Sequence, residues 1–309
     1  MAEADERNLQ GIVPALFTPL REDGSLDEES LEKLIEYQLA AGVHGIFAAG
    51  MSGEGALLGP TRLRELIRLC ARIIHGRVPL CAGVLEEGTD RVIEMAKMVE
   101  DAGADMLSTT VPIWSPAPTQ EEIVRHFEVI CRETGLPWMV YGNAGSFPDI
   151  MPDTMARLAD LEGIRAIKDT RPDFEGCLRD IEAVRGKQVS LLCGGEYLVG
   201  PGLLYGADGN ISGAANLFPK LFTDLYRDAR AGRVEQVREA AERIAAIHGM
   251  TRVPGVGWLA VFKYMGSRMG LMQPWCCRPH GILNKEQKRR VDAALERLDL
   301  PGTRSGGAG

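Results

Sequence analysis

The chain has 309 residues, of which 45% are hydrophobic and 25% charged, and its formal net charge is −8. This length can bury a large core, as one barrel-sized domain or as two smaller domains. The negative charge argues against a nucleic-acid-binding surface, and no apolar run approaches the roughly 18 residues of a membrane span.

The chain carries no pattern for export or for metal binding. The first ten residues, MAEADERNLQ, are acidic and polar, unlike a signal peptide. Seven scattered cysteines without a CxxC spacing indicate reduced thiols, so we expect a cytoplasmic protein. Cys276 and Cys277 are adjacent, which is a poor chelating geometry, and we expect them to pack in the core without a metal.

Short runs of strand-forming residues alternate with longer stretches of helical periodicity along the first 212 residues. The predicted strands span 11–18, 44–49, 79–84, 105–111, 138–141, 164–168, 189–193 and 209–212. The predicted helices span 27–41, 61–75 (with Thr61 as N-cap), 89–102, 119–134, 153–160, 173–184 and 196–204. Eight strand–helix units predict a (β/α)8 TIM barrel of the α/β class. A doubly wound open sheet is the alternative, but it usually carries a GxGxxG loop after its first strand, and none is present.

After residue 212 the pattern becomes helical, with predicted helices at 218–250, 255–270 and 284–298. We therefore expect a barrel with the catalytic site in residues 1–215, a C-terminal helical region in residues 216–298 and a disordered tail in residues 299–309.

Catalytic residues of such barrels gather at the carboxyl ends of the strands. Lys168 ends an apolar strand there, and burial of an unpaired ammonium is unfavourable. A neutral lysine amine can attack a ketone and form a Schiff base. The alternative is a structural lysine paired with Asp169 or Glu54.

Other strand ends offer candidate binding groups. The glycine-rich turn at 50–55 can direct backbone N–H groups at a carboxylate, with Ser52 adding a hydroxyl, or it is an ordinary tight turn. Glu54 in this turn is expected to be a buried structural carboxylate. Tyr141 can relay protons or simply pack in the core. Trp114 can form an aromatic wall, Asn143 a polar anchor, and Arg171 can bind a carboxylate. The alternatives are packing within a loop for Trp114 and Asn143 and a solvated surface position for Arg171.

Together these positions resemble the dihydrodipicolinate synthase/N-acetylneuraminate lyase family. The resemblance rests on GIVPALFTP at 11–19, GMSGE at 50–54, Tyr141, GIRAIKDT at 163–170 and GADGNISGAANLFP at 206–219. It covers residues 8–298 and implies a homotetrameric barrel that forms a Schiff base with pyruvate or another 2-oxo acid, without a cofactor.

The resemblance also implies residue roles. Lys168 becomes the Schiff-base lysine and Tyr141 the proton shuttle. The expected substrate-binding residues are Met51, Ser52, Gly53, Trp114, Asn143, Thr170, Glu196 and Ile211. Met51 stands where the family usually has a hydroxyl residue, so the hydroxyl relay is altered or is replaced by Ser52 and water.

The expected reaction is a class I aldolase-type cleavage or condensation of a 2-oxo acid with an aldehyde. Trp114, the YxN pattern of Tyr141 and Asn143, and Cys277-Arg278-Pro279 resemble the benzylidenepyruvate hydratase-aldolase branch. The synthase itself is the alternative, weakened because YGNAGSF (141–147) lacks the expected arginine, with Ser146 in its place. A noncatalytic 2-oxo-acid-binding homologue is the alternative outside the enzymes.

Overall fold

A computed structural model describes residues 9–113, 116–142 and 148–298 of the chain. Eight parallel strands form one sheet in the order β1-β8-β7-β6-β5-β4-β3-β2. They are β1 (Gly11–Pro14), β2 (Ile46–Ala48), β3 (Leu80–Gly83), β4 (Met106–Thr110), β5 (Trp138–Gly142), β6 (Ile164–Asp169), β7 (Ser190–Cys193) and β8 (Gly209–Ser212). Nearly every strand residue is buried, as expected for a parallel sheet covered by helices.

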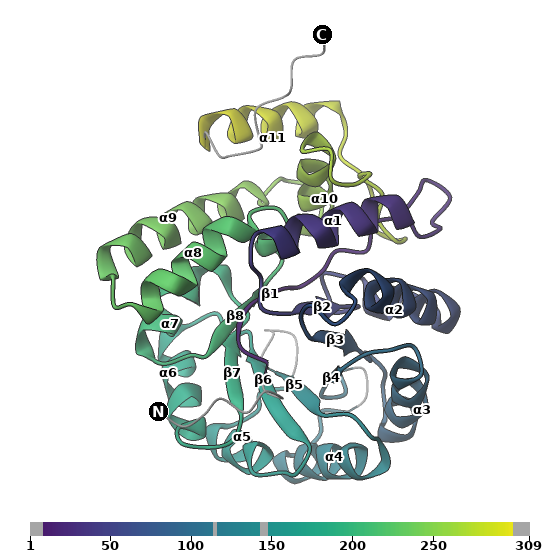
Figure 1. Cartoon of the computed structure of the whole chain (residues 1–309), viewed down its shortest axis with the longest axis vertical. Coiled ribbons are helices and arrows are strands. Elements are labelled where there is room, and N and C mark those ends of the chain that lie inside the picture. The colour runs from purple at the N-terminus through teal and green to yellow at the C-terminus, as the bar shows by residue number, and fades with distance from the viewer. Residues whose placement is uncertain (1–8, 114–115, 143–147, 299–309) are drawn as a thin grey trace.

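The sheet closes between β1 and β2. The backbone N–H of Leu16 donates to the carbonyl of Phe47 at 2.8 Å, and the N–H of His44 donates to the carbonyl of Ile12 at 2.8 Å. The predicted (β/α)8 TIM barrel with C-terminal helices is therefore confirmed (Figure 1).

Helices surround the barrel in the predicted alternation. They are α1 (Glu28–Ala40), α2 (Pro60–Ile74), α3 (Thr89–Glu100), α4 (Gln120–Glu133), α5 (Pro152–Ala159), α6 (Phe174–Val184), α7 (Val199–Tyr205) and α8 (Pro219–Arg230), with short 3-10 turns η1 (Gly55–Leu57), η2 (Glu196–Leu198) and η3 (Ala214–Asn216). The prediction of Thr61 as N-cap of α2 is wrong, because Gly59 is the N-cap and Pro60 takes the first helical position. Proline suits that position, where its missing N–H has no partner within the helix.

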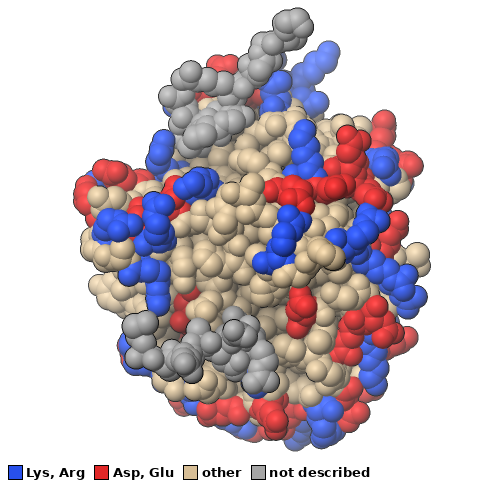
Figure 2. Space-filling view, viewed as in Figure 1, with Lys and Arg blue, Asp and Glu red and all other residues tan. Residues whose placement is uncertain are grey.

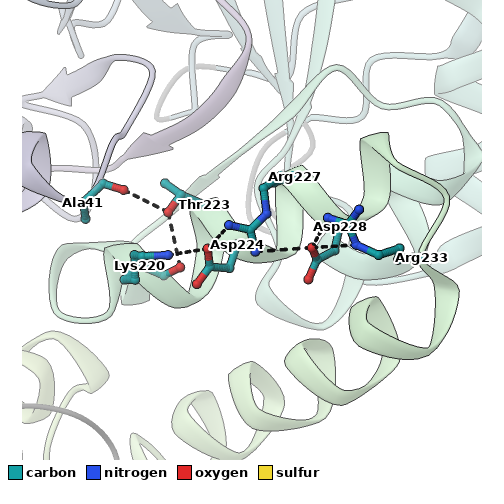
Figure 3. Close-up of polar contacts among 7 residues, drawn as sticks. All are labelled: Ala41, Lys220, Thr223, Asp224, Arg227, Asp228 and Arg233. Atoms are coloured by element: carbon teal, nitrogen blue, oxygen red, sulfur yellow. Dashed lines mark hydrogen bonds and ion pairs between the residues drawn. The ribbon is translucent and has the colours of Figure 1, made fainter.

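The single helix predicted at 218–250 is also wrong. The chain forms α8 and then α9 (Val234–Met250), separated by a turn in which Gly232 has a φ of 69°. Arg233 closes this turn with hydrogen bonds from Nε and Nη2 to Asp228 at 3.1 and 2.6 Å (Figure 3). At the other end of α8, the hydroxyl of Thr223 donates to the carbonyl of Ala41 at 2.9 Å, which holds α8 beside the end of α1.

Two further helices complete the described C-terminal region, α10 (Trp258–Arg268) and α11 (Lys285–Leu298). Figure 1 shows α10 close to the barrel and α11 at the outer end of the molecule. The boundary at residue 215 stays a prediction.

Acidic and basic side chains are interspersed on the face seen in Figure 2, in keeping with the many exposed ion pairs along the helices. Among the described residues, no helix has the length and apolar character needed to cross a membrane.

Candidate active site

Lys168 lies at the carboxyl end of β6, and its side chain is almost fully buried, with 4% of the residue exposed. The β5–β6 register sets it beside Tyr141. Its Nζ lies 3.7 Å from the centroid of the Tyr141 ring and 5.3 Å from that of Phe47. The amine therefore lies against two aromatic rings, and its burial keeps it from water.

The alternative that paired Lys168 with Glu54 is wrong, because the carboxylate of Glu54 forms a buried ion pair with Lys263. Across the described ranges, Lys168 makes no ion pair. Asp169 instead lies 3.8 Å from Arg171. A buried lysine without a carboxylate partner fits a nucleophilic role better than a structural one.

A pocket of about 520 Å³ opens at the carboxyl ends of the strands, and the ring of Tyr141 forms part of its wall. Glu54, Thr110 and Tyr141 are its buried polar residues, while Met51, Leu57, Leu85 and Ile113 supply apolar surface. Its mouth is lined by polar side chains, Glu86, Glu87, Arg91 and His280. Two predicted site residues, Tyr141 and Met51, therefore meet in one cavity, with Lys168 against the Tyr141 ring.

The glycine-rich turn after β2 has an unusual backbone conformation. Ala49 and Glu54, at φ 54° and 58°, take the left-handed conformation that non-glycine residues rarely adopt. A Cβ on Gly55 would lie 1.8 Å from the carbonyl oxygen of Ala49, so only glycine fits there. This local strain marks a backbone that the surrounding structure holds in place.

The turn presents unused hydrogen-bond donors. In the part of the chain that the structure describes, the backbone N–H groups of Ser52 and Gly53 donate no hydrogen bond. Gly50 begins the turn against the ring of Phe47, which also faces the amine of Lys168. The geometry thus brings two free N–H groups and the lysine to the same end of the barrel, as a carboxylate-binding turn requires.

A buried ion pair anchors this turn to the C-terminal region. Lys263 of α10 pairs with Glu54, and both side chains are at most 1% exposed. The ammonium also donates to the carbonyls of Thr18 and Trp275, each at 2.8 Å. The other carboxylate oxygen of Glu54 accepts from the N–H of Cys277 at 2.6 Å. Glu54 is buried and structural, as expected, but sequence reasoning missed Lys263, whose only signal is a lone cation within the apolar run 259–265.

The remaining predicted residues lie at neighbouring strand ends, outside the residues that line the pocket. Thr170 follows β6 with a buried hydroxyl, and Ile211 is a buried residue of β8. The carboxylate of Glu196 accepts from the hydroxyl of Ser212 at 2.9 Å and lies 3.4 Å from Nδ1 of His248. Trp114 and Asn143 lie outside the described residues.

Arg171 has neither of its expected roles. Its side chain is 13% exposed, and it pairs with the buried carboxylate of Asp180 and donates to the carbonyl of Ile150 at 2.8 Å. Burial raises the pKa of Asp180, and the guanidinium opposes that rise. Arg171 is therefore a structural residue that fixes the chain after β6.

The cysteines are free thiols. Burial raises the pKa of Cys276 to about 12 and also raises that of Cys277, which disfavours the thiolate that a metal requires. Across the described ranges, no group of three or more His, Cys, Asp or Glu residues is arranged to hold a metal ion.

Comparison with known proteins agrees with this geometry. Residues 8–298 match the model of the dihydrodipicolinate synthetase family. The 4-hydroxy-tetrahydrodipicolinate synthase of Teredinibacter turnerae is 34% identical, over 93% of this chain and 97% of that protein. The enzyme of the same name from a Psychrobacter species is 31% identical, over 94% and 96%.

Solved structures are similar over nearly the full length. The crystal structure of YagE, a prophage protein of this family from E. coli K12 in complex with pyruvate, superposes with a TM-score of 0.89 at 27% identity, covering 94% of this chain and 99% of that one. Dihydrodipicolinate synthase from Bacteroides thetaiotaomicron gives 0.89 at 28% identity, covering 94% and 98%. The chain belongs to the dihydrodipicolinate synthetase family, a family of lyases of the class I aldolase type.

Proposed function

We propose that this protein is a Schiff-base lyase that uses pyruvate or a closely related 2-oxo acid, with Lys168 as the nucleophile. The observation that carries the proposal is the buried amine of Lys168, 3.7 Å from the Tyr141 ring centroid and without a carboxylate partner. Both the match of the chain to the lyase family and the pyruvate complex of YagE support it.

In the proposed reaction, the amine attacks the carbonyl carbon of the 2-oxo acid, and water leaves to give an iminium. Loss of a C3 proton gives an enamine, whose carbon attacks the carbonyl of an aldehyde. Hydrolysis then returns the free lysine, and cleavage is the reverse sequence. The iminium acts as the electron sink.

The neighbouring groups position and protonate the reactants. The N–H groups of Ser52 and Gly53, with the Ser52 hydroxyl, hold the substrate carboxylate and so orient its carbonyl towards Lys168. Tyr141 passes a proton to or from the oxygens that change charge. Thr170 and Glu196 stay proposed contacts of the longer substrate, and Ile211 is proposed to line the site through its backbone carbonyl.

Two specific reactions are candidates for this site. Condensation with aspartate semialdehyde is favoured by the relatives, which are 4-hydroxy-tetrahydrodipicolinate synthases. A hydratase-aldolase reaction on aromatic 2-oxo acids is favoured by the apolar pocket surface of Leu57, Leu85 and Ile113. The absence of an arginine in residues 141–147 argues in the same direction.

The test is reduction with borohydride in the presence of pyruvate, followed by peptide mass mapping. We expect an adduct on Lys168 that is absent from Lys168→Ala and retained in the control Lys187→Ala, whose lysine pairs with Asp160 at the surface. An unmodified Lys168 in the wild-type protein refutes the proposal.

Steady-state rates with pyruvate plus aspartate semialdehyde and with a benzylidenepyruvate separate the two candidate reactions. An adduct without any turnover indicates a noncatalytic homologue.

We also propose that the protein is cytoplasmic, in keeping with its free cysteines, and that it is a homotetramer, as the family resemblance implies. Light scattering coupled to size-exclusion chromatography tests the tetramer, and a monomer mass at micromolar concentration contradicts it.

A further inference from the structure

The polar side chains at the mouth of the pocket are not equally available to a ligand. Glu86 accepts hydrogen bonds from Nε and Nη2 of Arg91 at 2.9 and 2.7 Å, so these two charges largely satisfy one another. Both oxygens of Glu87 accept from the N–H of Ile113, at 3.0 and 3.1 Å. These bonds hold the three charged side chains to groups of the protein itself.

His280 differs from its neighbours. It lines the same pocket, yet across the described residues its ring makes no hydrogen bond, ion pair or ring contact. It is contributed by the segment between α10 and α11, far in sequence from the strand ends that supply the rest of the wall. An imidazole can donate through one nitrogen and accept through the other, so it can bind a polar group of either kind.

The backbone of His280 is linked to the buried ion pair described above. Its N–H donates to the carbonyl of Cys277 at 3.0 Å, and the N–H of Cys277 in turn donates to Glu54 at 2.6 Å. The carboxylate of Glu54 thus anchors the segment that carries His280 as well as the turn that carries Ser52 and Gly53. Both parts of the pocket are therefore linked to the same buried carboxylate.

From these contacts we propose that His280 determines specificity for the second substrate. The class that it selects is an aldehyde whose body is apolar or aromatic and whose far end carries a hydrogen-bonding group. The aldehyde carbonyl lies towards Tyr141, the body lies against Leu57, Leu85 and Ile113, and the polar end meets the imidazole. The inference rests on the proposed Schiff-base function, because Lys168 and Tyr141 define the reacting end.

The test compares two aldehydes that differ only at the far end, benzaldehyde and 3-(hydroxymethyl)benzaldehyde, each condensed with pyruvate. The readout is the ratio of their kcat/KM values, which removes any general effect of a variant on activity. For the wild-type protein we expect the hydroxymethyl compound to be favoured about 10-fold, as for one hydrogen bond to a substrate.

The variants separate hydrogen bonding from packing. His280→Leu keeps the bulk and removes both nitrogens, so the ratio falls to about 1, whereas His280→Asn keeps a donor and an acceptor and retains a ratio of about 3 or more. His75→Asn is the matched control, because His75 is an exposed histidine in left-handed conformation at the end of α2, a conformation that asparagine tolerates. It should keep the wild-type ratio.

The outcomes distinguish the two proposals. If the Lys168 adduct forms but the ratio is near 1 in the wild type, or is unchanged in His280→Leu, the role of His280 is refuted and the Schiff-base function stands. If both benzaldehydes are inert and only short aldehydes react, the substrate class is refuted. If no adduct forms on Lys168, the Schiff-base function fails, and the role of His280 fails with it.

Discussion

Replacement of Lys263 by methionine isolates the ion pair that supports the pocket. The substitution keeps the length and apolar stem of the side chain and removes a charge that makes three contacts, to Glu54 and to the carbonyls of Thr18 and Trp275. It leaves the carboxylate of Glu54, whose side chain is 1% exposed, without its counter-ion. Loss of one partner from a fully buried pair destabilises a protein by about 3–5 kcal/mol.

The assay is urea unfolding at a fixed protein concentration, because association would also shift the midpoint. We expect Lys263→Met to lose about 3–5 kcal/mol of unfolding free energy, and the double variant Glu54→Gln/Lys263→Met to lose clearly less, since no buried charge remains. Arg179→Met is the control, since its ion pair with Glu175 lies at the surface, and its midpoint should not change measurably. A loss below about 1 kcal/mol for Lys263→Met would show that water reaches Glu54 and that the pair does not hold the turn.

Three further changes test the site and the fold. Tyr141→Phe removes the proton-transfer group, so kcat in steady-state assays should fall about 100-fold or more while borohydride still traps pyruvate on Lys168; an unchanged kcat contradicts the relay. Gly55→Ala places a Cβ 1.8 Å from a backbone oxygen and should cost about 1–3 kcal/mol in urea unfolding, whereas Gly249→Ala, in a helix with open space, should stabilise by about 0.5–1 kcal/mol; equal effects contradict the packing. Burial lowers the pKa of His126 from 6.5 to about 4. Between these pH values the histidine is protonated in the unfolded chain but not in the native state, so the free energy of unfolding should fall by about 3 kcal/mol from pH 6.5 to 4. His126→Gln should flatten that part of the pH–stability curve, and parallel curves would refute the burial effect.

The sequence predicts the barrel well because its signals are local and repeated. Each strand is an apolar run followed by an amphipathic helix, so misplaced ends, such as the start of α2 at Pro60, do not change the topology. The break between α8 and α9 was missed because good helix formers flank Gly232, and a single glycine is tolerated within many helices.

The site was predictable where it depends on strand ends and not where it depends on distant segments. Lys168 and Tyr141 face one another because their strands are neighbours in a barrel of known order. Lys263 and His280 come from the C-terminal helical part of the chain and lie near the pocket at the strand ends. Lys263 is separated from its partner Glu54 by 209 positions in the sequence. No periodicity or motif within a short window encodes such a contact, which exists only after the helices dock.

The link between Glu54 and Lys263 has a consequence for synthesis of the chain on the ribosome. Every strand of the barrel is translated before α10, so the sheet can close around a carboxylate whose counter-ion has not yet been made. A nascent or prematurely terminated chain that stops before Lys263 would therefore hold a nearly complete barrel with an unsupported turn after β2. Arrival of α10 completes the support of that turn, so ligand-binding competence should appear late in translation rather than with closure of the barrel.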